Sequence, residues 1–438
     1  MKSLIERAVH SLRHQKLSRD IAFTLGSFVV LAVSGIVINI VVTALRDAAA
    51  LGVFNLAYAV YIVASQFAVW GLHYSVLRHA AFYEKDAVER GHMLVTASAC
   101  ALGMGVVAAV AVALAEPLFQ RAFSSEATGA AIRNASIGLL LFPLNKVLLA
   151  YLNGLRLMKA FSVLQGLRYL IVMIAVAAIA ASSLPIEMTT FCFVVAELVT
   201  ALAAVAYLGA RGLLHHLRVT RAWVRRHYVF GTKGLAAGMF AEVNSRVDVL
   251  MIGFFLSDRA TGIYSFAAML VDGLYHVLAM VRINFNPMLV GALRDRDWAA
   301  ALKLREQSRV FVLPVTLVLG IGLLVAYWVL AGLIMPAEKG LMEGMPSLAI
   351  LLAGLICVSF LVPFDNLLMV TGHPGYQTGQ QVAAVLANVV VAWCLLPIMG
   401  IEGAALGTAA SYLVSTGLLV YLARRVVGWN LVANTFKG

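Results

Sequence analysis

The residues best suited to do chemistry in this chain are the few charged side chains that interrupt its apolar segments. A charge at membrane depth is costly unless it pairs with another group or faces water, which makes each one a candidate for a functional site. Cations suit a phosphate or diphosphate group, and carboxylates suit a coupling ion, H⁺ or Na⁺. The cations are Lys146, Arg246 and Arg282, and the carboxylates are Glu197, Glu242, Asp248, Asp272 and Asp365.

The densest group of polar residues lies between Glu242 and Asp248. On a helix, Glu242 and Arg246 are about 40° apart, which predicts an i,i+4 ion pair. Asp248 lies about 160° from Arg246 and shares a face with Asn244. We therefore expect this segment to serve two surfaces, one along a cavity and one against a neighbouring helix.

A second polar stripe follows along the next apolar segment. Asp272, Tyr275 and Arg282 fall within about 80° of one another on a helix, so we expect the stripe to face water. Glu197 and Asp365 are single carboxylates in their segments. For each of these charges, the alternative is an ion pair between helices or a side chain that reaches the headgroup layer.

For the three cations we favour a water-filled cavity over that alternative. Lys146 has no acidic residue within one helical turn. Together with Arg78 and Lys233 at helix ends, the cations would form a positive funnel suited to a phosphate or diphosphate group.

The elements that carry these residues are membrane helices. With 62% hydrophobic and 12% charged residues, the composition lies outside that of soluble domains, which are about 25% charged. A span of about 20 apolar residues crosses the hydrocarbon layer. We expect twelve spans, at residues 21–45, 51–77, 93–115, 131–153, 164–182, 188–210, 234–256, 260–286, 310–332, 346–369, 377–398 and 402–423.

The basic residues fix the orientation of these spans. With the N-terminus inside, the cytoplasmic segments hold 25 of the 33 lysines and arginines, and the outer loops hold five. This asymmetry follows the positive-inside rule and predicts cytoplasmic termini. The net charge of +12 is therefore a signal of topology and of contact with membrane lipids, and we expect no nucleic-acid partner.

A repeat divides the chain into two halves. Residues 52–57 (GVFNLA) and 262–267 (GIYSFA) share a pattern and lie 210 residues apart, at the starts of the second and eighth spans. We predict an all-α polytopic membrane protein with two parallel six-helix lobes around a central cavity. The expected domains are residues 1–210, a basic cytoplasmic linker at 211–233, and residues 234–438.

The sequence lacks the usual marks of an enzyme. It has no Walker lysine motif, no HExxH and no GxSxG, and its four cysteines all lie in apolar segments. We therefore expect no catalytic residue, no metal site and no cofactor. The energy for transport would come from an H⁺ or Na⁺ gradient or from the gradient of the substrate.

Several segments together resemble one known family. Residues 244–256 (NSRVDVLMIGFFL) followed by 262–267 resemble the start of the second half in polysaccharide transporters of the MOP superfamily, the Wzx-type O-antigen flippases. Further similar segments are Leu45-Arg46, residues 52–57, Gly71-Leu72, Arg78, residues 371–374 (TGHP) and residues 400–408 (GIEGAALGT).

The resemblance implies a flippase that turns an undecaprenyl diphosphate-linked oligosaccharide to the outer leaflet of a bacterial inner membrane by alternating access. It implies a role in lipopolysaccharide or other surface polysaccharide biosynthesis, with a polymerase and a chain-length regulator as protein partners. A cationic cavity would hold the diphosphate and glycan, which fits Lys146, Arg246, Arg282 and Tyr275. Arg46 and Asp248 match positions of the family and join the candidates.

Two other classes of protein remain open. A MATE-like multidrug exporter, coupled to a cation, would have an acidic cavity, often with a carboxylate in the first span, where this chain has Asn39 as its most polar central residue. A membrane-embedded polymerase or transferase would need a large outer loop, and every outer loop expected here is short.

Overall fold

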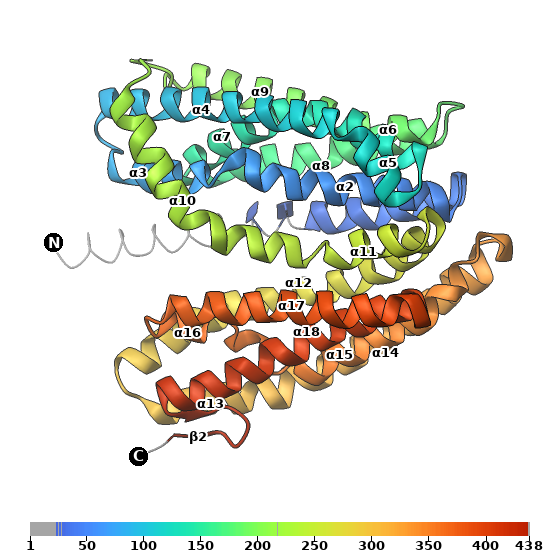
Figure 1. Ribbon diagram of the computed structural model, residues 1–438. Coiled ribbons are helices and arrows are strands. Elements are labelled where there is room, and N and C mark those ends of the chain that lie inside the picture. The colour runs from blue at the N-terminus through green and yellow to red at the C-terminus, as the bar shows by residue number, and fades with distance from the viewer. Residues whose placement is uncertain (1–22, 25, 28, 217, 437–438) are drawn as a thin grey trace. The chain divides into compact units, whose positions relative to one another are not determined.

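The computed structural model describes residues 23–436 apart from 25, 28 and 217 (Figure 1). The basic residues expected before the first span lie outside this part of the chain. The described residues are almost entirely helical, with one short β-hairpin near the C-terminus. They form two compact units, and each is described separately.

Unit 1 comprises residues 1–42, 60–120 and 126–238. It contains most of the helix Val29–Leu45 and the second part of α2 (Ala48–Val69). The other elements are α3 (Leu72–Phe82), α4 (Ala87–Leu114), the first part of α5 (Glu116–Phe123), α6 (Glu126–Ser136), η1 (Ile137–Leu140), α7 (Phe142–Gly154), α8 (Met158–Ala180), η2 (Ile186–Thr190), α9 (Phe191–Ala210) and most of α10 (Arg221–Asn244).

The core of unit 1 is built around α7. This helix packs against α3, α4, α8 and α9, and α8 packs along α9. Its apolar side chains, among them Leu148 and Leu152, join a buried cluster with Val76 of α3 and Met93 of α4. Because α7 is enclosed on several sides, its polar residues Asn145 and Lys146 are held against neighbouring helices.

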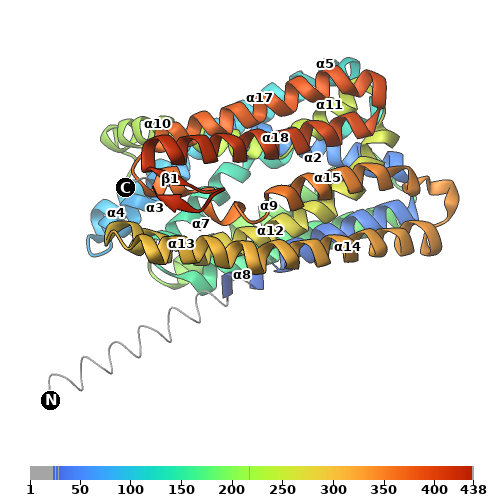
Figure 2. The same cartoon turned by 90° about the horizontal axis from the view of Figure 1, so that it is seen from below.

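Unit 2 comprises residues 43–59, 121–125 and 239–438. Its helices are α11 (Val247–Phe255), α12 (Asp258–Arg294), α13 (Trp298–Gln307), η3 (Ser308–Val312), α14 (Leu313–Val329), η4 (Leu330–Ile334), η5 (Ala337–Lys339), η6 (Leu341–Gly344), α15 (Met345–Val358), η7 (Val362–Phe364), α16 (Leu367–Val370), α17 (Pro374–Met399), α18 (Ile401–Leu422) and η8 (Ala423–Val427). The helices α17 and α18 run side by side, as both views show (Figures 1 and 2).

A hairpin closes unit 2 after η8. Strands β1 (Trp429–Asn430) and β2 (Thr435–Phe436) pair antiparallel, and Trp429 is fully buried against the rings of Phe364 and Phe436. The buried guanidinium of Arg305 donates to the backbone oxygens of Leu431 and Val432. These contacts fix the hairpin on the ends of α13 and η7.

Nine helices of the described chain are long and apolar enough to cross a bilayer, and the bent pair Glu126–Leu140 and Phe142–Gly154 is a tenth candidate. The protein is thus an all-α polytopic membrane protein. Four of the twelve expected spans are interrupted in the described part of the chain. The span at 51–77 breaks at Trp70-Gly71, between α2 and α3, and the span at 131–153 bends by 43° between Leu140 and Phe142. The span at 234–256 breaks between α10 and α11, at the polar run that contains Arg246, and the span at 346–369 ends as a helix at Val358, before Pro363.

The expected division into domains stays a prediction. The two compact units separate between Gly238 and Met239, and the first-half segment Thr43–Ala59 belongs to unit 2. Residues 221–233 of the expected linker are the first turns of α10, which continues beyond them.

Candidate functional site

A cavity of about 220 Å³ lies within unit 1, between α3, α7, α8 and α9. The residues that line it are mixed, with aromatic rings and apolar side chains beside several polar groups. The polar side chains other than tyrosine are His73, Asn145, Lys146, Asn153, Gln165, Arg168 and Glu197. These seven side chains are half of the fourteen lining residues, so the cavity suits a polar ligand.

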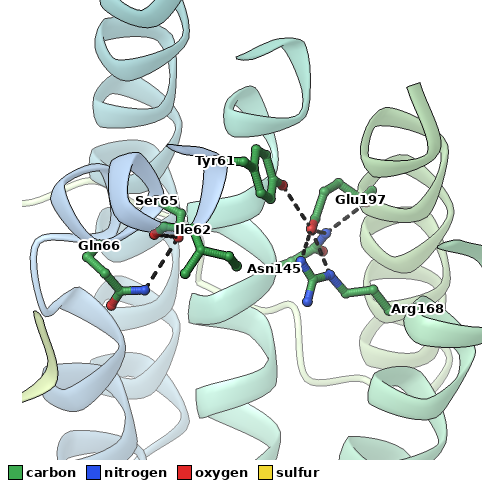
Figure 3. Close-up of polar contacts among 7 residues, drawn as sticks. All are labelled: Tyr61, Ile62, Ser65, Gln66, Asn145, Arg168 and Glu197. Atoms are coloured by element: carbon green, nitrogen blue, oxygen red, sulfur yellow. Dashed lines mark hydrogen bonds and ion pairs between the residues drawn. The ribbon is translucent and has the colours of Figure 1, made fainter. Parts of the chain in front are cut away.

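The most strongly bonded group in the cavity wall is the carboxylate of Glu197, whose side chain is 1% exposed. Arg168 pairs with its Oε1 at 2.5 Å from Nη2 and 2.7 Å from Nε, and the Tyr61 hydroxyl donates to the same oxygen at 3.2 Å. Asn145 donates through Nδ2 to Oε2 at 2.7 Å and to the backbone oxygen of Glu197 at 2.8 Å. Figure 3 shows Tyr61, Asn145 and Arg168 converging on this carboxylate from different helices.

Glu197 was a single carboxylate in the sequence, and the structure supplies its partner. Arg168 lies on α8 and was counted among the cytoplasmic basic residues, although it falls inside the expected span at 164–182. The position of Arg168, four residues inside that expected span, was the one feature of the sequence that indicated a location in the membrane. The pair is the interhelical ion pair that stood as the alternative for Glu197.

Lys146 is half-buried at the same cavity. Its Nζ lies 5.5 Å from the centroid of the Phe142 ring, and the Cζ of Arg168 lies 5.0 Å from the same centroid. Two cations therefore share the wall with one carboxylate, which gives a formal charge of +1 for these three residues. Since the carboxylate already accepts bonds from Arg168, Asn145 and Tyr61, the excess charge is positive on the Lys146 side.

The second group of candidates lies in unit 2, around the break between α10 and α11. Arg246 stands at this break, with its Cζ 4.9 Å from the ring centroid of Tyr58. Its electrostatic neighbours include Asp272, Asp248 and Glu242. The i,i+4 geometry expected for Glu242 and Arg246 assumed one continuous helix, whereas α10 ends at Asn244.

Asp248 is buried at the start of α11 and ties three helices together. Its Oδ2 accepts from the hydroxyl of Tyr264 on α12 at 2.7 Å and lies 3.5 Å from Oγ1 of Thr408 on α18. Its Oδ1 accepts from the backbone N–H of Val249 at 2.8 Å. These contacts place Asp248 against neighbouring helices, and its role as a carrier of a coupling ion stays a prediction.

The polar stripe of α12 is present, and one of its members is paired. Arg282 Nη1 lies 3.4 Å from Asp365 Oδ2, and the two side chains are 24% and 20% exposed. Tyr275 stacks on Tyr412 of α18 with ring centroids 6.3 Å apart, and Asp272 is exposed. Counting Arg246 and Arg282 against Glu242, Asp248, Asp272 and Asp365, this group has a formal charge of −2.

The remaining candidates lie elsewhere. The Arg78 guanidinium is exposed on α3, 5.2 Å from the ring centroid of Phe230, and Arg46 accepts a bond on its backbone oxygen from Lys339. The side chain of Lys233 lies outside the described residues. Lys146 thus belongs to unit 1 and Arg246 and Arg282 to unit 2, and their expected meeting in one central cavity stays a prediction.

A family comparison identifies the chain. Residues 17–289, more than half of it, match the model of a family described as polysaccharide biosynthesis protein. The chain belongs to this family. The resemblance to MOP polysaccharide transporters drawn from the sequence is thereby confirmed. A search of curated proteins gave no match.

Solved structures show that this family member has the fold of MOP superfamily transporters. An inward-facing MATE multidrug resistance transporter is 13% identical, with a TM-score of 0.73 over 92% of this chain and 95% of that one. The lipid II flippase MurJ in an inward closed conformation is 12% identical, with a TM-score of 0.75 over 92% and 87%. A MOP superfamily transporter from Pyrococcus furiosus, described by a reversed polarity of its binding pocket, is 14% identical, with a TM-score of 0.54 over 96% and 95%.

Proposed function

We propose that this protein is a Wzx-type flippase that carries an undecaprenyl diphosphate-linked oligosaccharide across the bacterial inner membrane for surface polysaccharide biosynthesis. Membership of the polysaccharide biosynthesis family supports this role. The substrate combines an apolar tail, which can stay in the bilayer, with a polar, anionic head that needs a sheltered path. Alternating access of the two halves would move that head between leaflets.

The observation that carries the proposal is the cavity of unit 1. It places polar side chains and an excess positive charge at Lys146 beside α8 and α9, which are long and apolar enough to cross a membrane. Such groups are costly in lipid surroundings unless they serve a substrate or a partner. The cavity suits the polar head of a lipid-linked glycan better than an organic cation, because the carboxylate in its wall is already bonded to Arg168.

The other roles follow from the same proposal. Glu242, Asp248, Asp272 and Asp365 are proposed carriers of the coupling H⁺ or Na⁺, and Arg246, Arg282 and Tyr275 are proposed contacts of the substrate head. The basic segments would face the cytoplasm, together with both termini. A polymerase and a chain-length regulator would take the product on the outer side.

A MATE-like exporter of organic cations is the second candidate, favoured by one observation. The charged group around Arg246 and Arg282 in unit 2 carries an excess of carboxylates. A cation exporter would use such acidic groups to hold its substrate. The two functions differ in what accumulates when the protein is removed.

The test is deletion of the gene in the bacterium that carries it, followed by complementation. Loss of a surface polysaccharide, with lipid-linked oligosaccharide retained on the cytoplasmic leaflet, supports the flippase. Complementation with Lys146→Ala should restore export about tenfold less well, since a hydrogen bond to a charged group contributes about 1.5–3 kcal/mol. Lys159→Ala is the matched control, because Lys159 is exposed on α8 and does not line the cavity.

Two outcomes would reject the flippase. In the first, surface polysaccharide is unchanged in the deletion strain. In the second, the strain instead becomes sensitive to organic cations and the complemented strain expels them, which is the behaviour of the exporter. Equal export by Lys146→Ala and the wild type would remove the cavity from the transport path.

A further inference from the structure

Two buried polar atoms on residues that line the unit 1 cavity have no hydrogen-bond partner in the described part of the chain. They are Oδ1 of Asn145 and Nδ1 of His73. The positions of the oxygen and nitrogen in the Asn145 amide are assigned by its hydrogen bonds, because Nδ2 donates to both Oε2 and the backbone oxygen of Glu197. Oδ1 is therefore left as an acceptor, and an unsatisfied buried acceptor costs about 1–3 kcal/mol.

The surroundings of these two atoms indicate which functional group of a ligand could form hydrogen bonds with them. A phosphate group offers only acceptor oxygens near neutral pH, so it cannot donate to Asn145 Oδ1. A hydroxyl group both donates and accepts. It can donate to Asn145, serve either tautomer of His73 and accept from Lys146.

The volume of the cavity and the apolar part of its wall restrict the class of ligand further. Phe161, Tyr74 and Tyr169 line the cavity, and aromatic side chains suit the C–H face of a pyranose. The volume of about 220 Å³ is below the ~300–1,000 Å³ of pockets for drug-sized ligands. One sugar residue therefore suits the space inside the cavity.

We propose that this cavity is a subsite for a single sugar residue of the carried glycan, read through its hydroxyl groups by Asn145, His73 and Lys146. The proposal rests on the proposed flippase function and deepens it. It assigns the glycan, and not the diphosphate, to the cavity of unit 1, and it locates part of the selectivity for the glycan there. Binding through these atoms requires the side chains of Asn145 and His73 to turn toward the ligand.

The experiment measures binding of small sugars to the full-length protein in lipid nanodiscs by ligand-observed NMR. The probes are the methyl glycosides of a hexose, an N-acetylhexosamine, a 6-deoxyhexose and a uronic acid, with inorganic pyrophosphate as competitor. We expect at least one glycoside to bind and pyrophosphate not to displace it. His73→Phe keeps a ring but removes Nδ1, and it should weaken binding about 3- to 10-fold, the effect of one hydrogen bond.

Controls keep the result specific to the cavity. His92→Phe makes the same exchange on α4, at a residue that does not line the cavity, and should leave binding unchanged. Should His73→Phe fail to insert, Gln165→Leu removes another polar group of the wall and carries the same expectation. The subsite is rejected when no glycoside binds, when pyrophosphate displaces the glycoside, or when the His92 variant loses binding as much as the His73 variant does.

The outcome is separable from that of the proposed function. A wild-type protein that restores export of the lipid-linked glycan but binds none of the glycosides refutes the subsite and leaves the flippase standing. A protein that binds a glycoside through His73 but whose deletion leaves surface polysaccharide intact refutes the flippase.

Discussion

Gly52 at the start of α2 and Gly262 at the start of α12 meet in a reciprocal contact. A Cβ added to Gly52 would lie 1.8 Å from the backbone oxygen of Asp258, and one added to Gly262 would lie 1.8 Å from the backbone oxygen of Ala48. Each glycine thus faces the carbonyl four residues before the other. The two positions are equivalent in the sequence repeat, so this contact joins matching points of the two halves.

The close approach predicts that neither glycine tolerates a side chain. Gly262→Ala must push α2 and α12 apart, and overpacking of this kind costs about 1–3 kcal/mol or more. We expect a lower melting temperature of the purified protein and a loss of export. Gly273→Ala on the same helix is the control, since a Cβ there meets nothing within 4 Å. Equal melting of the two variants would show that the helices can separate at no cost.

The buried ion pair of Arg168 and Glu197 predicts a large effect of a small substitution. Glu197→Gln leaves the Arg168 guanidinium buried without its counter-charge, which typically costs about 3–5 kcal/mol. Thermal unfolding in detergent and the yield of inserted protein measure this loss. Asp295→Asn is the control, because its pair with Arg294 is exposed and should contribute nothing measurable.

A double variant distinguishes the effect of the two charges on stability from the effect of side-chain packing. Exchanging Arg168 for Met as well as Glu197 for Gln removes both charges, so the double variant should melt above the single Glu197→Gln variant. A double variant that melts lower than the single one would mean that Arg168 stabilises the unit through its stacking on Phe142 and not through the pair.

The sequence predicted the fold class because membrane spans are local features. About twenty apolar residues in a row and the asymmetry of basic residues are each visible without knowing which helices touch. The repeat glycines were also visible, as a pattern at Gly52 and Gly262. Their direct contact was not, because a repeat shows equivalence of positions and does not show distance.

The pairing of charges could not be predicted, because it depends on tertiary contacts. Arg168 and Glu197 are 29 residues apart, and Arg282 and Asp365 are 83 apart, so no helical spacing connects them. The break after Asn244 was hidden for a different reason: the apolar residues on both sides continue the same pattern, and only the polar run between them marks the interruption. The cavity of unit 1 could be anticipated only through Lys146.

His227 predicts that the protein loses stability in mild acid. It is buried outside the spanning helices, where Ser75 Oγ and the backbone oxygen of Met93 contact its ring nitrogens. Burial lowers the pKa of His227 to about 4, with the backbone bond to Met93 opposing and nearby His79 adding to the effect. The pKa of His79 is lowered in the same direction, chiefly by burial.

The lowered pKa of His227 sets the direction in which stability changes with pH. The unfolded chain binds a proton near pH 6.5 and the folded one only near pH 4, so stability is complete above about pH 6.5 and falls as the pH drops. The expected loss is about 2 kcal/mol at pH 5. Melting curves between pH 7.5 and 5 measure it. His227→Gln should flatten the pH dependence and His92→Gln should not, and a steep dependence that persists in the His227 variant would place its source elsewhere.

Arg246 and Arg282 provide the test of the substrate path in unit 2. Both guanidiniums lie among carboxylates, and Arg282 is 3.4 Å from Asp365, so either could be a structural cation or a contact of the diphosphate. We expect Arg246→Ala and Arg282→Ala each to lower export of lipid-linked glycan at least tenfold while the protein still inserts, since a charge-assisted bond to a diphosphate is lost. Arg294→Ala, at the exposed end of the same helix as Arg282, is the control for a change of charge. Surface polysaccharide and protein in the membrane are measured in the same cells. Normal polysaccharide in both variants would take the two arginines out of the substrate path and leave the pair with Asp365 as a link between α12 and η7.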